Sequence, residues 1–133
     1  MQNFLERATP GALALYRIAI GLIFFFYGSS RFFDWPVAGE FEAPELFAFP
    51  TWWAAAIQIV GGGLVILGLF TRTAAFLSSG SMAVAYFWMH QPEGLTLLNN
   101  GGVASALLCW ALFILVFVGP GALSVDGLLR KKK

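Results

Sequence analysis

One stretch, residues 51–75, limits most strongly what this chain can fold into. Residues 51–70 form an apolar run with three consecutive glycines, which stops at Thr71-Arg72-Thr73 before a second apolar run begins at once. As an α-helix the first run is about 30 Å long, which matches the hydrocarbon thickness of a bilayer. A three-residue polar break between two such runs predicts a transmembrane helical hairpin, against which the remaining segments must pack.

The composition supports a membrane protein. Of the 133 residues, 59% are hydrophobic and only 11% are charged, whereas a soluble domain usually has about 25% charged residues. Too few charges are present to cover a water-facing surface, so we expect an integral membrane protein in contact with the lipid bilayer. The one cluster of lysine and arginine is the C-terminal tail, so nucleic acid is not an expected partner.

The apolar runs predict four membrane-spanning helices, at about residues 11–33, 51–70, 73–89 and 103–118, in a single domain covering residues 1–133. Pro10 is placed to open the first helix, and the glycine-proline-glycine sequence after residue 118 to end the last. A cleaved signal peptide is the alternative for the first run, but its apolar core would be unusually long. The expected fold class is therefore all-α, a polytopic membrane four-helix bundle.

The distribution of charge predicts the orientation. Arg72 and the tail Arg130–Lys133 lie on one side of an even-numbered bundle, whereas loops 34–50 and 90–102 contain no lysine or arginine. The positive-inside rule then places both termini in the cytoplasm. Arg31, at the outer end of the first helix, is the exception. A basic juxtamembrane tail of this kind is also attracted to anionic lipid.

Three strongly polar side chains lie within the first two predicted helices. Arg17 and Arg31 share one helical face with the small residues Gly21 and Gly28. Arginines in membrane helices either face the bundle or extend to an interface, and both alternatives stay open. Gln58, deep in the second helix, either forms hydrogen bonds between helices or contacts a ligand.

The sequence offers few residues for redox or metal chemistry. Cys109 is the only cysteine, so no internal disulfide or paired-cysteine redox centre can form, and a small buried side chain is expected there. His90 is the only histidine, so one chain cannot form a bis-histidine haem site. The carboxylates of loop 34–50 lack the spacing of a known ligand motif. We therefore assign no catalytic residue and no metal site.

Several short motifs together resemble a known family. They are Arg17, Gly21, Tyr27-Gly28, Arg31, Gln58, Gly61-Gly62, Gly68, Thr71-Arg72, His90, Asn100-Gly101, Gly119-Pro120-Gly121 and Ser124-Val125-Asp126. Their order and spacing, over nearly the whole chain, resemble the DoxX family of small bacterial membrane proteins. The resemblance implies a multi-pass four-helix bundle in the bacterial cytoplasmic (inner) membrane. Some members are linked to quinone-coupled sulfur oxidation, as small subunits of thiosulfate:quinone oxidoreductases or terminal oxidases, and others to detoxifying redox complexes.

The chain departs from the family pattern at several positions. Where relatives often have His-Gly and Lys in the first helix, this chain has Tyr27-Gly28 and Arg31. Gln58 replaces a common glutamate, and Val103 stands where an acidic residue is common. Two carboxylates that could carry protons are thus missing, and glutamine does not titrate. These departures argue against enzymatic activity of the isolated chain.

Two functional hypotheses follow. In the first, the protein is an accessory or membrane subunit of a quinone-linked redox system. A quinone headgroup would then bind in a polar pocket of Arg17, Tyr27, Arg31, Gln58 and Arg72, and an oxidoreductase partner would supply the electrons. In the second, the bundle is a non-enzymatic scaffold or a carrier for a small solute or anion. The glycine-rich helix faces also allow self-association.

Overall fold

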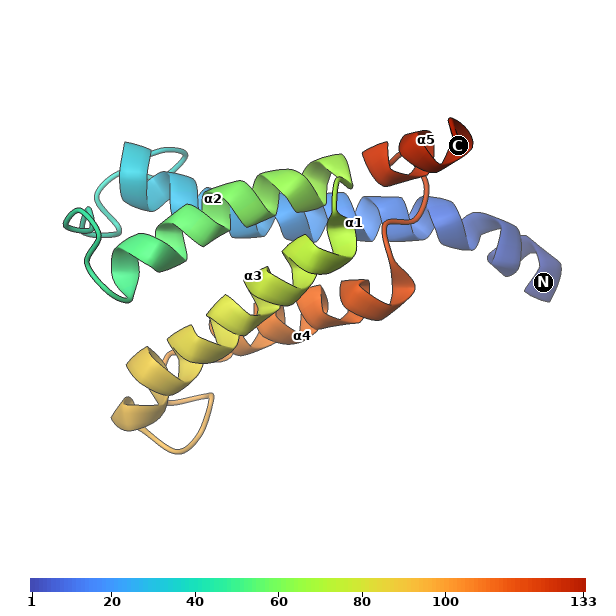
Figure 1. Ribbon diagram of the computed structural model, residues 1–133. Coiled ribbons are helices and arrows are strands. Elements are labelled where there is room, and N and C mark those ends of the chain that lie inside the picture. The colour runs from blue at the N-terminus through green and yellow to red at the C-terminus, as the bar shows by residue number, and fades with distance from the viewer.

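The computed structural model describes all 133 residues and contains helices but no strands. The α-helices are α1 (Gln2–Phe33), α2 (Thr51–Leu67), α3 (Thr71–Ala85), α4 (Val103–Val118) and α5 (Val125–Lys131), with a π-helical turn at Tyr86–His90 and a 3-10 turn at Gln91–Glu93. Helices α1 to α4 run back and forth, so the two termini lie at the same end of the molecule (Figure 1).

The helix boundaries differ from the expected ones for three of the four helices. The helix expected at 73–89 is α3, Thr71–Ala85, followed by the π-helical turn. α1 begins at Gln2, and Pro10 lies inside the helix instead of opening it. α2 ends at Leu67 because Gly68 adopts a left-handed conformation with φ 69°, a conformation that glycine adopts without steric cost. The short α5 was not expected.

By length and composition, α1 is the one helix long and apolar enough to cross a bilayer, while α2 and α4 are shorter apolar helices.

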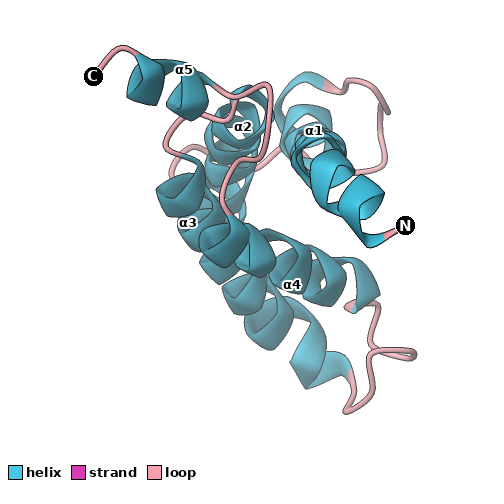
Figure 2. Ribbon diagram, turned by 90° about the vertical axis from the view of Figure 1, so that its right-hand side faces the viewer, coloured by secondary structure: helices cyan, strands magenta, loops and turns pink.

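The helices pack as two pairs. α1 packs along α2 and α3 packs along α4, while α2 and α3 connect the pairs and α1 scarcely touches α4. The pairs meet at the end that carries the termini and diverge toward loops 34–50 and 94–102 (Figures 1 and 2). We call these the closed end and the open end. One of the few α1–α4 links is a hydrogen bond from the Tyr16 hydroxyl to the Ala111 carbonyl, at 2.7 Å.

Glycines allow α1 and α2 to approach closely. A Cβ atom added to Gly62 would lie 2.9 Å from the Phe25 backbone nitrogen, and one added to Gly28 would lie 2.7 Å from the Ala55 carbonyl oxygen. Both distances are shorter than real Cβ atoms show. Small residues of this kind let helix backbones approach and gain van der Waals contact. Gly63, beside Gly62 in the sequence, faces open space.

The core lies between the two pairs. Its buried apolar side chains come from all four long helices: Phe24, Val65, Ala74, Ala75, Met82, Leu108, Leu112 and Leu115. Most of the other large apolar side chains are exposed on the outside of the helices. A protein with so small a core and so apolar an exterior is suited to a lipid environment.

These glycines give a paired prediction. We expect Gly62→Ala to lower stability by about 1–3 kcal/mol, because the new methyl group overpacks against α1. Gly63→Ala should leave stability unchanged or raise it by up to about 1 kcal/mol, because alanine favours a helix and the space is empty. Thermal unfolding of both variants in mild detergent checks the prediction, and equal melting temperatures would contradict it.

Candidate functional site

At the closed end, Arg17 of α1 is fully buried, with 0% of its surface exposed. Its Nη1 donates hydrogen bonds to the carbonyl oxygens of Pro120 and Ala122, the second at 3.1 Å. Its Nη2 donates to the carbonyls of Leu123 at 2.8 Å and Ile66 at 3.4 Å. Arg17 therefore connects α1, the last turn of α2 and the segment after α4. All four of these hydrogen bonds go to the protein backbone, whereas the Nε of Arg17 is buried without a partner.

Arg72, in the first turn of α3, has a similar structural contact. Its Nη1 donates to the carbonyls of Val116 at 2.7 Å and Phe117 at 2.8 Å. These carbonyls lie in the last turn of α4, where they have no partner within the helix. The positive charge is also favourable at a helix C-terminus. Arg72 thus caps α4 and holds α3 and α4 together.

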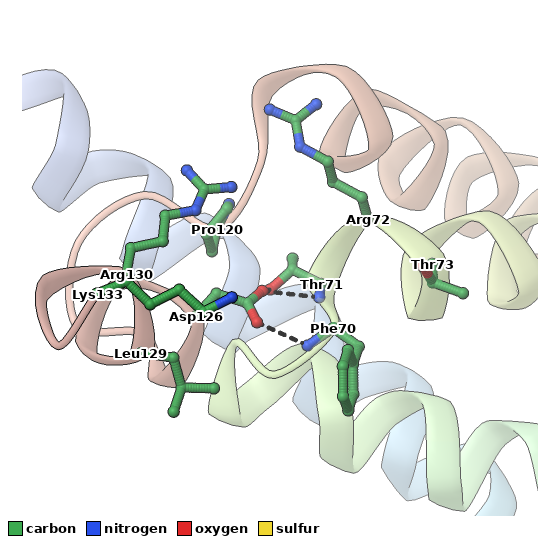
Figure 3. A pocket seen from close by; sticks show the side chains of 9 residues that line it. All are labelled: Phe70, Thr71, Arg72, Thr73, Pro120, Asp126, Leu129, Arg130 and Lys133. Atoms are coloured by element: carbon green, nitrogen blue, oxygen red, sulfur yellow. Dashed lines mark hydrogen bonds between the residues drawn. The ribbon is translucent and has the colours of Figure 1, made fainter.

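Asp126, in the first turn of α5, caps the start of α3. Its carboxylate accepts hydrogen bonds from the backbone N–H groups of Phe70 and Thr71, both at 2.9 Å, and from the Thr71 hydroxyl at 2.8 Å (Figure 3). The Asp126 N–H in turn donates to the Gly68 carbonyl at 2.9 Å. α5 is therefore fastened to the turn between α2 and α3.

These contacts also lower the pKa of the Asp126 carboxyl below its ordinary value of 3.8. Burial alone would raise the pKa, but the hydrogen bonds from Thr71 and Phe70 and the nearby charge of Arg130 outweigh that effect. A carboxyl group whose pKa is lowered on folding stabilises the folded state above that pKa.

At the open end, a cleft of about 470 Å³ lies between the diverging helix pairs. α1 contributes Tyr27 and Arg31, and α2 contributes Gln58. The other side of the cleft, formed by α3, the π-helical turn and α4, includes His90 and Ser105. The remaining lining is mostly apolar and includes two phenylalanines of loop 34–50, Phe41 and Phe49. An apolar hollow with a few converging polar groups is the usual form of a small-molecule site.

Two of these polar groups lack partners in the protein. Gln58 is only 4% exposed, and its Oε1 has no hydrogen bond. The Nε of Arg31 is likewise buried without a partner, while its guanidinium carbon lies 4.8 Å from the centre of the Phe41 ring. An unpaired buried polar group costs about 1–3 kcal/mol, so its presence requires a reason. A ligand that hydrogen-bonds in the cleft would supply one.

A hydrogen-bond network holds the turn that carries His90. The Asn100 side chain donates to the Tyr86 hydroxyl at 3.2 Å and the Gly94 carbonyl at 3.0 Å, and accepts from the Gly102 N–H at 2.8 Å. The Asn100 carbonyl lies 3.2 Å from Nδ1 of His90. Asn100 thus fixes the loop and orients the imidazole ring at the cleft.

The structure separates the five residues of the expected polar pocket. Tyr27, Arg31 and Gln58 line the same cleft, whereas Arg17 and Arg72 lie at the closed end and bind backbone carbonyls. His90, Ser105 and Phe41 also line the cleft, although sequence reasoning did not assign them to it. The proximity of the histidine-bearing turn to the first hairpin has no signal in the sequence, because it depends on how the two helix pairs meet.

The fold and cleft define a small all-helical protein with an apolar exterior and a cleft that is partly lined by polar groups. The profile of the DoxX family matches residues 12–91. The chain is 37% identical to an uncharacterized protein of Haemophilus influenzae, over 98% of this chain and 99% of that protein. The chain therefore belongs to the DoxX family, and the resemblance noted in the sequence is confirmed.

Two further relatives come from Escherichia coli. The inner membrane protein YqjF is 38% identical over 54% of this chain and 56% of its own length. The inner membrane protein YphA is 29% identical over 90% of this chain and 91% of its own length. No solved structure matches the chain.

The Asp126 contacts give a pH-dependent prediction. We expect Asp126→Asn to lower stability at pH 7 by about 1–2 kcal/mol, because the amide caps α3 less well than a carboxylate. Since the folded-state pKa is lowered, this difference is present above the ordinary pKa of aspartate and is lost as the pH falls through the folded value. Melting temperatures of both proteins from pH 7 down to acid pH test this. A difference independent of pH would contradict it.

Proposed function

We propose that the chain is a multi-pass protein of the bacterial cytoplasmic (inner) membrane, in which α1 to α4 form a four-helix bundle. The family membership and the inner membrane relatives support the location. Both termini are cytoplasmic in this proposal, because Arg72 and the basic tail lie at the same end as the termini, and loops 34–50 and 90–102 have no lysine or arginine. One domain covers residues 1–133.

Reporter fusions test this orientation. We expect a fluorescent protein at the C-terminus to fluoresce, and alkaline phosphatase to be inactive there but active when inserted at Gly39 of the acidic loop. A Cβ atom at Gly39 meets nothing within 4 Å, so the loop has room for an insertion. Active phosphatase at the C-terminus would overturn the proposed orientation.

We further propose that the cleft binds a quinone headgroup and that the protein is an accessory or membrane subunit of a quinone-linked redox system. The observation that carries this proposal is the buried, unpaired Gln58 beside a cleft that also holds Arg31. A quinone is a flat apolar ring with two carbonyl acceptors. The Gln58 amide N–H, the Tyr27 hydroxyl and the Arg31 guanidinium are donors that suit those carbonyls. The unpaired Oε1 of Gln58 is an acceptor and suits a hydroxyl of the reduced quinone. The phenylalanines of the acidic loop can pack on the ring.

In this proposal the chain binds the quinone and an oxidoreductase partner supplies the electrons. The single cysteine and single histidine give the chain no paired redox centre of its own. Gln58 also cannot exchange a proton, so its role is to hold and orient the ring. His90 is the one imidazole that lines the cleft, and it can donate or accept a hydrogen bond there.

Binding of a short-chain ubiquinone to the purified protein tests the site. We expect Gln58→Leu and Arg31→Gln each to weaken binding about tenfold, because the first removes the amide donor from the cleft and the second replaces a charged donor by a neutral one. Arg7→Gln is the matched control, since Arg7 lies on the same helix but is fully exposed and far from the cleft in sequence. Unchanged binding in both cleft variants, or no binding by the wild-type protein, would contradict the quinone site.

A native pull-down from membranes in mild detergent tests the partner. Recovery of an oxidoreductase together with the chain supports the redox subunit. Recovery of the chain alone, or as a self-associated form carrying only bulk lipid, favours the alternative, a non-enzymatic scaffold or a carrier for a small solute or anion. Arg31 in the cleft suits the anion version of that alternative.

A further inference from the structure

A second hollow, of about 260 Å³, lies at the closed end, away from the quinone cleft. Its walls come from Phe70 and the start of α3, from Pro120 after α4, and from α5 together with Lys133 beyond it (Figure 3). Three basic side chains line it: Arg72, Arg130 and Lys133. The hollow shares no residue with the open-end cleft, although Arg72 and Asp126 in its lining also form the capping hydrogen bonds described above.

The hollow carries a net positive charge. Asp126 is the only acidic side chain in its lining, and its carboxylate is occupied by the three hydrogen bonds from Phe70 and Thr71. The contacts of Arg72 with carbonyl groups of α4 leave its full charge in place. Three cations therefore face one engaged carboxylate, which favours an anionic ligand.

The hollow is also bordered by exposed apolar side chains. Phe70 and Leu129 line it and are 66% and 51% exposed. Leu128 and Leu123 do not line the hollow, but they lie on and just before α5 and are 62% and 85% exposed. In water these side chains would be unfavourable, whereas at a membrane surface they can enter the boundary between headgroups and acyl chains. A free phosphate ion would use the cations but not this apolar border.

We propose that this hollow binds the headgroup of an anionic glycerophospholipid, with the lipid phosphate among Arg72, Arg130 and Lys133. The glycerol and the upper acyl chains then lie along Phe70 and Leu129. α5, fastened by Asp126 to the turn before α3, forms one wall of this site and so links lipid binding to the closed end. The proposal goes beyond the quinone function and does not depend on it.

Native mass spectrometry of the full-length protein, delipidated in neutral detergent and then given equal amounts of phosphatidylglycerol and phosphatidylcholine, tests the proposal. We expect phosphatidylglycerol to be retained about tenfold more strongly. The double variant Arg130→Gln with Lys133→Gln should reduce that preference about tenfold, since each cation near a lipid surface contributes measurably. Excess inorganic phosphate should not displace the lipid.

The matched control is Lys131→Gln with Lys132→Gln, which removes the same charge from the same tail but not from the hollow. We expect it to change the preference less than about twofold. Leu129→Gln should weaken retention of phosphatidylglycerol although all the cations remain. Equal effects of the two double variants would show a diffuse attraction to the tail and overturn the site. Equal retention of both lipids, or displacement by inorganic phosphate, would also overturn it.

Discussion

The arrangement of the helices depends on one buried cation. Arg17 enters the closed end with no exposed surface and binds carbonyls from the end of α2 and from the segment after α4. A buried charge is costly unless its hydrogen bonds are supplied, and here the irregular backbone of residues 120–123 supplies them. The backbone carbonyls of that segment in turn need hydrogen-bond donors, because the segment lies among helices and does not form a helix itself. Arg17 supplies those donors. The cation and the irregular segment therefore require each other.

The two ends of the molecule have opposite character. At the closed end, Arg17, Arg72 and Asp126 each connect two or more elements through hydrogen bonds to the backbone. At the open end, no comparable contact joins α1 to α4, and buried polar atoms of Arg31 and Gln58 lack partners. Arg17 Nε at the closed end also lacks a partner, but of the residues with unpaired buried polar atoms only Arg31 and Gln58 line the cleft.

The sequence predicted the helical class and the approximate positions of the four long helices, because apolar runs and glycine breaks are local signals. It also predicted the membrane family, through the order and spacing of short motifs. It also selected Gln58 and Arg31, since isolated polar residues stand out in apolar helices. It could not separate them from Arg17 and Arg72, because a guanidinium bonded to backbone carbonyls and one facing a ligand look alike in a sequence. Nor did it indicate α5, a short helix that depends on the capping contacts of Ser124 and Asp126.

The contact between the helix pairs has a mechanical consequence. The helices of each pair are closely packed, because glycines let α1 approach α2 and because α3 and α4 pack along their length. The pairs are joined at the closed end and diverge toward the cleft, so the closed end is the point about which one pair would rotate relative to the other. A small rotation at the pivot becomes a larger displacement at the tips, since displacement grows with distance from the pivot. Any change in packing around Arg17 that rotated one pair would therefore change the width of the cleft at the opposite end of the molecule.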